Sequence, residues 1–230
     1  MKAMDKWMIE DPTLGVISMV DRFKDQNITV NPKRVRRLMR LMGLMAIYPK
    51  KHLSQLGAKK YIHPYLLRGL SITRPNQVWA IDISYIPMKK GFMYLTAIID
   101  VYSRKIISWG LSNSLAAQCC LEVLQEGIKK YGKPEIVNSD QGAQFTCEDW
   151  IEKLKLEGIK ISMDGKGRAI DNIFIERFFR TIKQRYVYLN PAENGIELFL
   201  GIKDFMRKYN NRRHQGIGRI SPNKKYHLAA

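Results

Sequence analysis

An aspartate inside a strongly apolar run is the feature that most limits what this chain can fold into. Residues 78–86 read Val-Trp-Ala-Ile-Asp-Ile-Ser-Tyr-Ile, a β-branched and aromatic stretch of strand length. Because Asp82 stands between Ile81 and Ile83, we expect its carboxylate in the interior of a buried strand. A carboxylate taken out of water is costly unless a cation or several hydrogen-bond donors face it. The fold must therefore bring such groups to Asp82.

A second acidic residue follows another short apolar strand. Residues 135–137 read Glu-Ile-Val, and Asp140 comes soon afterwards in Asn-Ser-Asp-Gln-Gly, where Gly142 permits a tight turn. Loops at strand ends commonly carry functional groups. Asp140 is therefore a second candidate site residue.

The stretch 172–185 predicts an amphipathic helix. Its apolar residues recur at helical spacing along one side: Ile175, Phe178, Phe179, Ile182 and Tyr186. The opposite side carries Asn172, Glu176, Arg180 and Lys183. Taken alone, Glu176 is explained by an i,i+4 ion pair with Arg180, worth a few tenths of a kcal/mol.

Together, two strand-borne aspartates and this helix-borne glutamate form a set that suits a hard cation. Mg²⁺ takes carboxylate oxygens from few protein ligands and leaves places for water and phosphate. Asp82, Asp140 and Glu176 are therefore candidate metal ligands, and 35 residues separate the second from the third.

Four motifs resemble one known family. They are Trp-Ala-Ile-Asp-Ile at 79–83, Asn-Ser-Asp-Gln-Gly-Ala-Gln-Phe at 138–145, Ile-Ser-Met-Asp-Gly-Lys-Gly-Arg at 161–168 and Asp-Asn-Ile-Phe-Ile-Glu at 171–176. The pattern resembles the integrase core of bacterial insertion-sequence transposases, most of all the OrfB type of the IS-three family, and covers nearly the whole chain. It departs where many relatives have His in place of Asn138 and often an acidic residue in place of Arg185.

The resemblance implies that Asp82, Asp140 and Glu176 are the catalytic triad of a ribonuclease-H-like fold shared with retroviral integrases. It implies a DDE-type DNA transposase that nicks an element end and then transfers the exposed 3′-OH to another DNA strand. Two Mg²⁺ ions, for which Mn²⁺ substitutes, would activate the attacking group and stabilise the leaving oxygen. In this interpretation Asp82 bridges both ions, Asp140 holds one and Glu176 holds the other.

Two other functions stay open. A nuclease of the same fold would only hydrolyse, for instance the RNA strand of a hybrid, and the basic N-terminal region argues against it. An inactive or domesticated DNA-binding regulator would keep the fold, and the intact triad argues against that. The expected partners are element-end and target DNA, further copies of this chain on that DNA, and the upstream reading-frame protein as a partner or fusion.

Charge is distributed unevenly along the chain, which has a formal net charge of +18. Residues 1–75 hold 15 Lys and Arg against 5 Asp and Glu, residues 76–165 hold 10 against 11, and residues 166–230 hold 14 against 5. Two basic flanks around a neutral centre indicate a polyanion held on both sides of an acidic site, and a phosphate backbone is the obvious one.

In the N-terminal region, residues 1–50, the pattern from Pro12 to Ile47 predicts two helices around a turn that resemble a DNA-binding helix-turn-helix. Leu14, Ile17 and Val20 begin the first apolar stripe. Asn31 is a good N-cap for a second helix that starts at Pro32. Its apolar side comprises Val35, Leu38, Met39 and Met42, and its other side Lys33, Arg34, Arg36, Arg37 and Arg40. We take Arg36, Arg37 and Arg40 as DNA contacts; a solvated basic surface is the alternative.

After a basic linker at 51–74, residues 75–230 predict the catalytic core and a C-terminal helical tail. Three strands ending near residue 111 form a meander, and then helix, strand, helix, strand and helix follow. This order predicts an α/β, ribonuclease-H-like domain with a mixed five-stranded sheet and flanking helices. Asp100, at the end of the second strand, is a fourth acidic candidate, with a turn aspartate as the commoner explanation.

Further cations are candidate DNA contacts. Lys166 and Arg168 lie in a glycine-containing loop, with a simple connector as the alternative. Arg180 and Lys183 follow Glu176 on its helix face. Arg213 belongs to a terminal stretch, with Tyr209, Asn210 and His214, that resembles a family signature; packing of this tail onto the core is the alternative.

Cysteine and histidine exclude some classes of protein. The three cysteines form neither a disulfide framework nor a CxxC pair, and the four histidines lack metal-ligand spacing, so a zinc site is not expected. No apolar run approaches membrane-spanning length, and the start lacks the apolar region of a signal peptide. We therefore expect a cytoplasmic protein associated with the nucleoid.

Overall fold

The computed structural model describes residues 1–46, 63–164 and 172–228. The chain divides into two compact units, Met1–Leu56 and Gly57–Ala230, and each is described by itself. No helix among the described residues is both long and apolar enough to cross a membrane.

The first unit is a small helical bundle. Its helices are α1 (Lys2–Glu10), α2 (Val16–Asp25) and α3 (Pro32–Leu41). The predicted cap is confirmed: the Asn31 side chain accepts a hydrogen bond of 2.8 Å from the backbone N–H of Lys33, and Pro32 takes the first helical position. Eight buried apolar side chains form the core: Met4, Trp7, Met8, Leu14, Met19, Val20, Val35 and Met39.

Two expectations for this unit were wrong. Helix α1 was not predicted, although Met4, Trp7 and Met8 recur at helical spacing on its buried side. Ile17 is 62% exposed instead of lining the core. The reason is that α2 begins at Val16, so Leu14 precedes the helix and sets no helical period for it. Within α2, Met19 and Val20 face the core.

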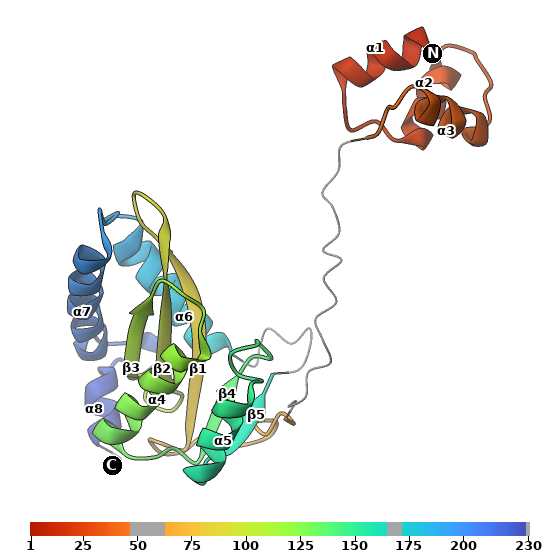
Figure 1. The fold of residues 1–230 in the computed structure, drawn as a ribbon. Coiled ribbons are helices and arrows are strands. Elements are labelled where there is room, and N and C mark those ends of the chain that lie inside the picture. The colour runs from red at the N-terminus through yellow and green to blue at the C-terminus, as the bar shows by residue number, and fades with distance from the viewer. Residues whose placement is uncertain (47–62, 165–171, 229–230) are drawn as a thin grey trace. The chain divides into compact units, whose positions relative to one another are not determined.

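The second unit is built on a five-stranded mixed sheet with helices on both faces, which confirms the predicted fold class (Figure 1). The strand order is β3-β2-β1-β4-β5. β1 pairs with β2 and β2 with β3 in antiparallel fashion, and β1 pairs with β4 and β4 with β5 in parallel. The strands are β1 (Val78–Pro87), β2 (Phe92–Asp100), β3 (Ile106–Ser112), β4 (Ile136–Ser139) and β5 (Lys160–Met163).

The pleat of β1 assigns its residues to two separate cores. Val78, Ala80 and Ile86 pack with helices α6 (Ile173–Ile182) and α7 (Gly195–Asn211). Trp79 and Ile81 face the other way, toward α4 (Ala117–Tyr131) and α5 (Glu148–Leu156). Because side chains alternate along a strand, Asp82 falls on the α6 face.

Helix α6 confirms the predicted apolar stripe, because Ile175, Phe178, Phe179 and Ile182 are buried. The chain continues beyond it as a π-helical turn, η1 (Lys183–Val187). Asn172 was expected on the exposed side and is instead 5% exposed, with no hydrogen-bond partner for its Oδ1. It occupies the N-cap position with a non-helical backbone and no capping hydrogen bond from its side chain, so the helical wheel does not apply to it.

The C-terminal segment packs onto the core. No separate helix was predicted at 222–227, and these residues form helix α8 (Pro222–His227), whose N-cap Ser221 side chain accepts a hydrogen bond from the Lys224 N–H. Tyr226 of α8 is 4% exposed and donates a hydrogen bond of 2.9 Å to Asn76 Oδ1. The ammonium group of Lys105, itself buried, lies 4.1 Å and 4.3 Å from the ring centroids of Tyr131 and Tyr226.

Asp100 is a structural residue of the β2–β3 turn, as its commoner explanation predicted. Its carboxylate is fully buried and accepts hydrogen bonds from the backbone N–H groups of Ser103 and Asn76 and from the Ser103 hydroxyl. These donors engage both oxygens and account for Asp100 as a residue that stabilises the turn.

Candidate active site

Three aspartates lie side by side across neighbouring parallel strands, Asp82 within β1 and Asp140 and Asp164 directly after β4 and β5. The ladder pairs Ala80 of β1 with Asn138 of β4, and Asn138 with Ser162 of β5. Two residues further along each strand come Asp82, Asp140 and Asp164. Since parallel strands keep their register, the sheet places these carboxylates in one row.

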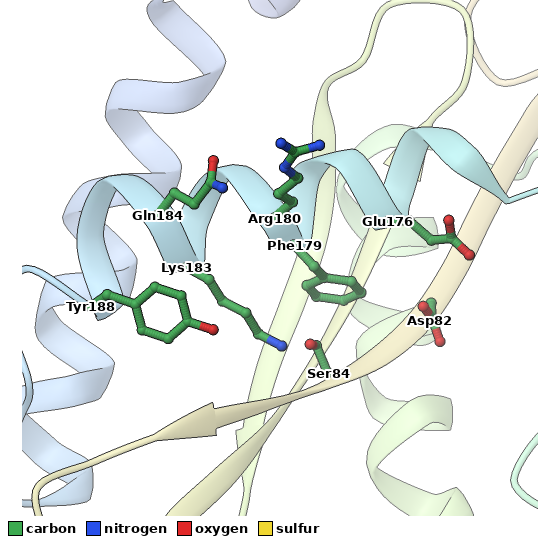
Figure 2. A pocket seen from close by; sticks show the side chains of 8 residues that line it. All are labelled: Asp82, Ser84, Glu176, Phe179, Arg180, Lys183, Gln184 and Tyr188. Atoms are coloured by element: carbon green, nitrogen blue, oxygen red, sulfur yellow. The ribbon is translucent and has the colours of Figure 1, made fainter.

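Helix α6 brings Glu176 to the first of these aspartates. Asp82 and Glu176 line one pocket of about 390 Å³, together with Ser84, Arg180 and Lys183. Figure 2 shows the carboxylates of Asp82 and Glu176 close together, one from the strand and one from the helix above it. This proximity follows from the pleat, which turns Asp82 and Ser84 toward α6 while Ile81 faces the opposite core.

This arrangement changes the pKa of Asp82. Burial raises the pKa of Asp82 to about 7, and the nearby carboxylates of Asp140, Glu176 and Asp164 raise it as well. A hydrogen bond of 2.7 Å from the Ile83 backbone N–H acts in the opposite direction. The site thus holds more negative charge than its own donors compensate.

The carboxylates are not arranged as a preformed metal-binding site. Within residues 1–46, 63–164 and 172–228, no group of three or more His, Cys, Asp or Glu side chains is placed to hold a metal ion. Asp82 and Glu176 share a pocket, whereas Asp140 is exposed at the end of β4 and influences Asp82 through its charge. The chemistry of the set, oxygen donors with uncompensated negative charge, nevertheless fits a hard divalent cation.

Asp164 is a site residue that the sequence interpretation passed over. It was read only as the start of a loop, although it follows β5 as Asp140 follows β4, and that parallel was the available signal. The buried Asn138 side chain donates a hydrogen bond of 2.8 Å to Asp164 Oδ1 and accepts one of 2.7 Å from the Ser162 hydroxyl. Asn138 therefore fixes the carboxylate of Asp164 at this edge of the sheet.

The cations on α6 take different positions in the pocket. Figure 2 shows the Lys183 ammonium group reaching toward Ser84 on β1, while Arg180 points away from the strand. Burial lowers the pKa of Lys183, and the charge of Asp82 raises it. Among the described residues, Arg180 makes no ion pair with Glu176 within 4.0 Å, so the i,i+4 explanation of Glu176 does not hold in this structure.

The remaining candidate DNA contacts lie elsewhere. Arg36, Arg37 and Arg40 are exposed on α3 in the first unit, and Lys166 and Arg168 lie outside the described residues. Arg213 is exposed after α7. The other three residues of the signature stretch pack against the core. Tyr209 is buried, and the centroid of its ring lies 4.5 Å from that of His214. Asn210 exchanges hydrogen bonds with the Ile106 backbone. For those three residues, core packing is what the structure shows.

The raised pKa of Asp82 predicts a pH-dependent stability for the metal-free protein. The folded state retains this proton up to about pH 7, whereas the unfolded chain releases it near the ordinary value of 3.8. The stabilisation is therefore complete below pH 3.8 and is lost as pH rises toward 7, at up to about 1.4 kcal/mol per pH unit.

Urea unfolding in a chelator at several pH values checks this expectation. Asp82→Asn should lose this component of the pH dependence and become more stable than the wild type at pH 8, whereas Asp149→Asn, a change at an exposed residue of α5, should follow the wild type. Parallel curves for the wild type and Asp82→Asn would contradict it.

Solved structures share this fold. The HTLV-2 integrase catalytic core domain in complex with magnesium (trimeric form) matches with a TM-score of 0.55 at 20% identity, over 67% of this chain and 98% of that chain. A simian T-cell lymphotropic virus intasome in complex with PP2A regulatory subunit B56 gamma matches with a TM-score of 0.59 at 15% identity, over 86% and 67%. The second unit thus has the ribonuclease-H-like fold of integrase cores.

Sequence comparisons identify the protein family within this fold class. Residues 72–169 and 157–222 match two Integrase core domain families, and residues 1–52 match an HTH-like domain. The transposase for insertion sequence element IS904 of Lactococcus lactis subsp. lactis (strain IL1403) is 35% identical over 90% of this chain and 85% of that protein. Transposase InsF for insertion sequence IS3A of Escherichia coli (strain K12) is 30% identical over 90% and 75%. The chain belongs to the IS3 family of insertion-sequence transposases.

Proposed function

We propose that Asp82, Asp140 and Glu176 are the catalytic carboxylates of this transposase and hold two Mg²⁺ ions. The observation that carries the proposal is the meeting of Asp82 with Glu176 in one pocket, beside the strand ends that bear Asp140 and Asp164. Uncompensated negative charge at Asp82 supports it, because a bound dication would offset that charge. Mn²⁺ fits the same oxygen donors.

When bound, such a pair of ions supplies an activated water or 3′-hydroxyl and charge stabilisation for the leaving oxygen. The protein's own contribution is to position these carboxylates. Asp82 is fixed by β1 and by the hydrogen bond from the Ile83 N–H, and Glu176 by the buried stripe of α6. Asp164, held by Asn138, adds a further negative charge and thereby strengthens the attraction for cations.

DNA is the proposed substrate, as element ends and as target. Arg180 and Lys183 line the carboxylate pocket and would hold the phosphates on either side of the scissile bond. We also propose Lys166, Arg168 and Arg213 as DNA contacts. Further copies of the chain, and the upstream reading-frame protein as partner or fusion, are proposed participants, and the nucleoid is the proposed location.

The test is an assay with an end-bearing DNA, a target plasmid and Mg²⁺ that scores nicking and joining separately. Both products, each abolished by a chelator, are expected. Nicking without joining would favour a nuclease that only hydrolyses. DNA binding with neither product would favour an inactive regulator.

The N-terminal unit offers an independent prediction. Replacing Arg36, Arg37 and Arg40 with Ala should weaken DNA binding by roughly tenfold or more at moderate salt, because each phosphate contact contributes to the salt-dependent affinity. Melting temperature and far-UV circular dichroism should hardly change, since all three side chains are exposed and make no ion pair with the described residues.

The matched control replaces the exposed acids Asp21 and Asp25 of α2 with Asn, which should not weaken binding. A large loss of melting temperature with unaltered affinity in the arginine variant would instead assign these side chains a structural role.

A further inference from the structure

A second pocket, of about 260 Å³, lies beside α6 and away from the carboxylates. It is bounded by α6, the β2–β3 turn that carries Arg104, and the segment between Tyr209 and Gly216. Arg177, the residue next to Glu176, lines it. Consecutive residues point about 100° apart around a helix, so the two pockets occupy neighbouring faces of α6.

The lining of this pocket is cationic. Arg104 and Arg177 contribute guanidinium groups to it, His214 contributes an imidazole, and no Asp or Glu lines it. Among the described residues, neither arginine lies within 4.0 Å of a carboxylate, whereas Arg207 on the nearby α7 is paired with Asp204 at 2.7 Å. The charge of the buried Asp100 acts on Arg104 from beyond ion-pair distance, but the two neighbouring guanidinium groups still repel one another, and an anion would relieve that repulsion.

Arg104 is held in a fixed position. Its guanidinium carbon lies 3.2 Å from the centroid of the Phe174 ring, and its Nη1 donates to the Val101 carbonyl. Burial lowers the pKa of Arg104 to about 10; the charges of Tyr209 and Asp100 raise it and that of Arg177 lowers it, and the group remains protonated at neutral pH. A restrained guanidinium presents its remaining donors with little loss of entropy on binding, as phosphate recognition requires.

His214 experiences the same positive surroundings. Burial lowers its pKa, and the charges of Arg185, Arg212 and Arg104 act in the same direction. Tyr209 also lines the pocket and carries a hydroxyl group, whereas the Thr181 hydroxyl already donates to the Arg177 carbonyl. The pocket therefore combines guanidinium groups with neutral polar groups, and a tetrahedral oxyanion accepts hydrogen bonds from both.

We propose that this pocket, defined by Arg104, Arg177 and His214, binds a backbone phosphate of DNA outside the scissile position. The inference rests on the proposed function, which supplies the DNA. A strand or second duplex passing α6 would thus be held on two faces of the helix, at Arg180 and Lys183 beside the carboxylates and at Arg104 and Arg177 beyond them. The second contact would fix the path of the DNA without touching the reacting phosphate.

Arg177→Ala and Arg207→Ala test the proposal as a matched pair, because both residues are exposed helical arginines of the same unit. Arg177→Ala should weaken binding of a generic duplex by roughly three- to tenfold at 0.1 M salt and lower the slope of log K against log salt by about one. Arg207→Ala should change neither. Arg104→Lys keeps the charge but loses the planar fork, so affinity should fall with a nearly unchanged slope.

Arginine modification by phenylglyoxal, mapped by mass spectrometry, gives a second readout on the unmutated protein. The duplex should protect Arg177 and leave Arg207 reactive. Two results together would overturn this inference and leave the proposed function standing. Arg177 would stay reactive in a complex that nicks DNA normally, and the Arg177→Ala and Arg207→Ala variants would bind DNA equally well. Equal protection by inorganic phosphate at the same phosphate concentration would overturn the DNA assignment. A wild type that neither binds nor nicks DNA would overturn both.

Discussion

Asp82→Asn should bind DNA at least as tightly as the wild type and yet nick and join it on the order of a thousandfold more slowly, or worse. The substitution keeps the size of the side chain and removes its charge. Asp82 is the most central carboxylate of the site. Burial and three neighbouring acids raise its pKa, and Glu176 lines the same pocket. Without its charge, the proposed set of metal ligands loses its most central member.

Nicking and joining rates, measured with excess Mg²⁺ beside a binding titration, separate this expectation from a structural role. Asp149→Asn, which removes an exposed acid from α5, should leave rates and affinity at wild-type values. A parallel loss of affinity and activity in Asp82→Asn, with a lower melting temperature, would show that the carboxylate stabilises the fold instead.

Tyr226→Ala should lower the free energy of unfolding of the second unit by about 3–5 kcal/mol, the usual cost of removing a buried aromatic side chain. The Tyr226 ring is 4% exposed and covers the ammonium group of Lys105, which is only 2% exposed. Its hydroxyl also donates to Asn76, whose own backbone N–H supports Asp100 in the β2–β3 turn. Loss of the ring therefore removes apolar packing, a cation–π contact and a hydrogen bond together.

Two companion variants divide these contributions in a urea titration. Tyr226→Phe deletes only the hydroxyl and should cost about 1 kcal/mol. Tyr188→Ala removes a ring that is 62% exposed and should cost no more than about 0.5 kcal/mol. Equal stability of Tyr226→Ala and Tyr188→Ala would mean that α8 does not hold the core.

Local patterns predicted the elements because each pattern reports the environment of one segment. The Asn31-Pro32 start of α3 and the buried stripe of α6 follow from capping and period alone. The same reasoning failed for Ile17, because its period was counted from Leu14 outside the helix, and for Asn172, which stands at the N-cap position. It also missed α8, a short helix stabilised by the contacts of Tyr226 with distant residues.

The sequence by itself determined which residue types could do the chemistry: an aspartate within an apolar strand, another after a strand, and a glutamate on an amphipathic helix. Only the tertiary structure decided how they meet. Parallel register set Asp82, Asp140 and Asp164 in one row, and the pleat turned Asp82 toward Glu176. Packing likewise gathered Arg104 and Arg177, 73 residues apart, around one pocket. Such proximity depends on long-range pairing of strands and helices, which no local pattern of residues records.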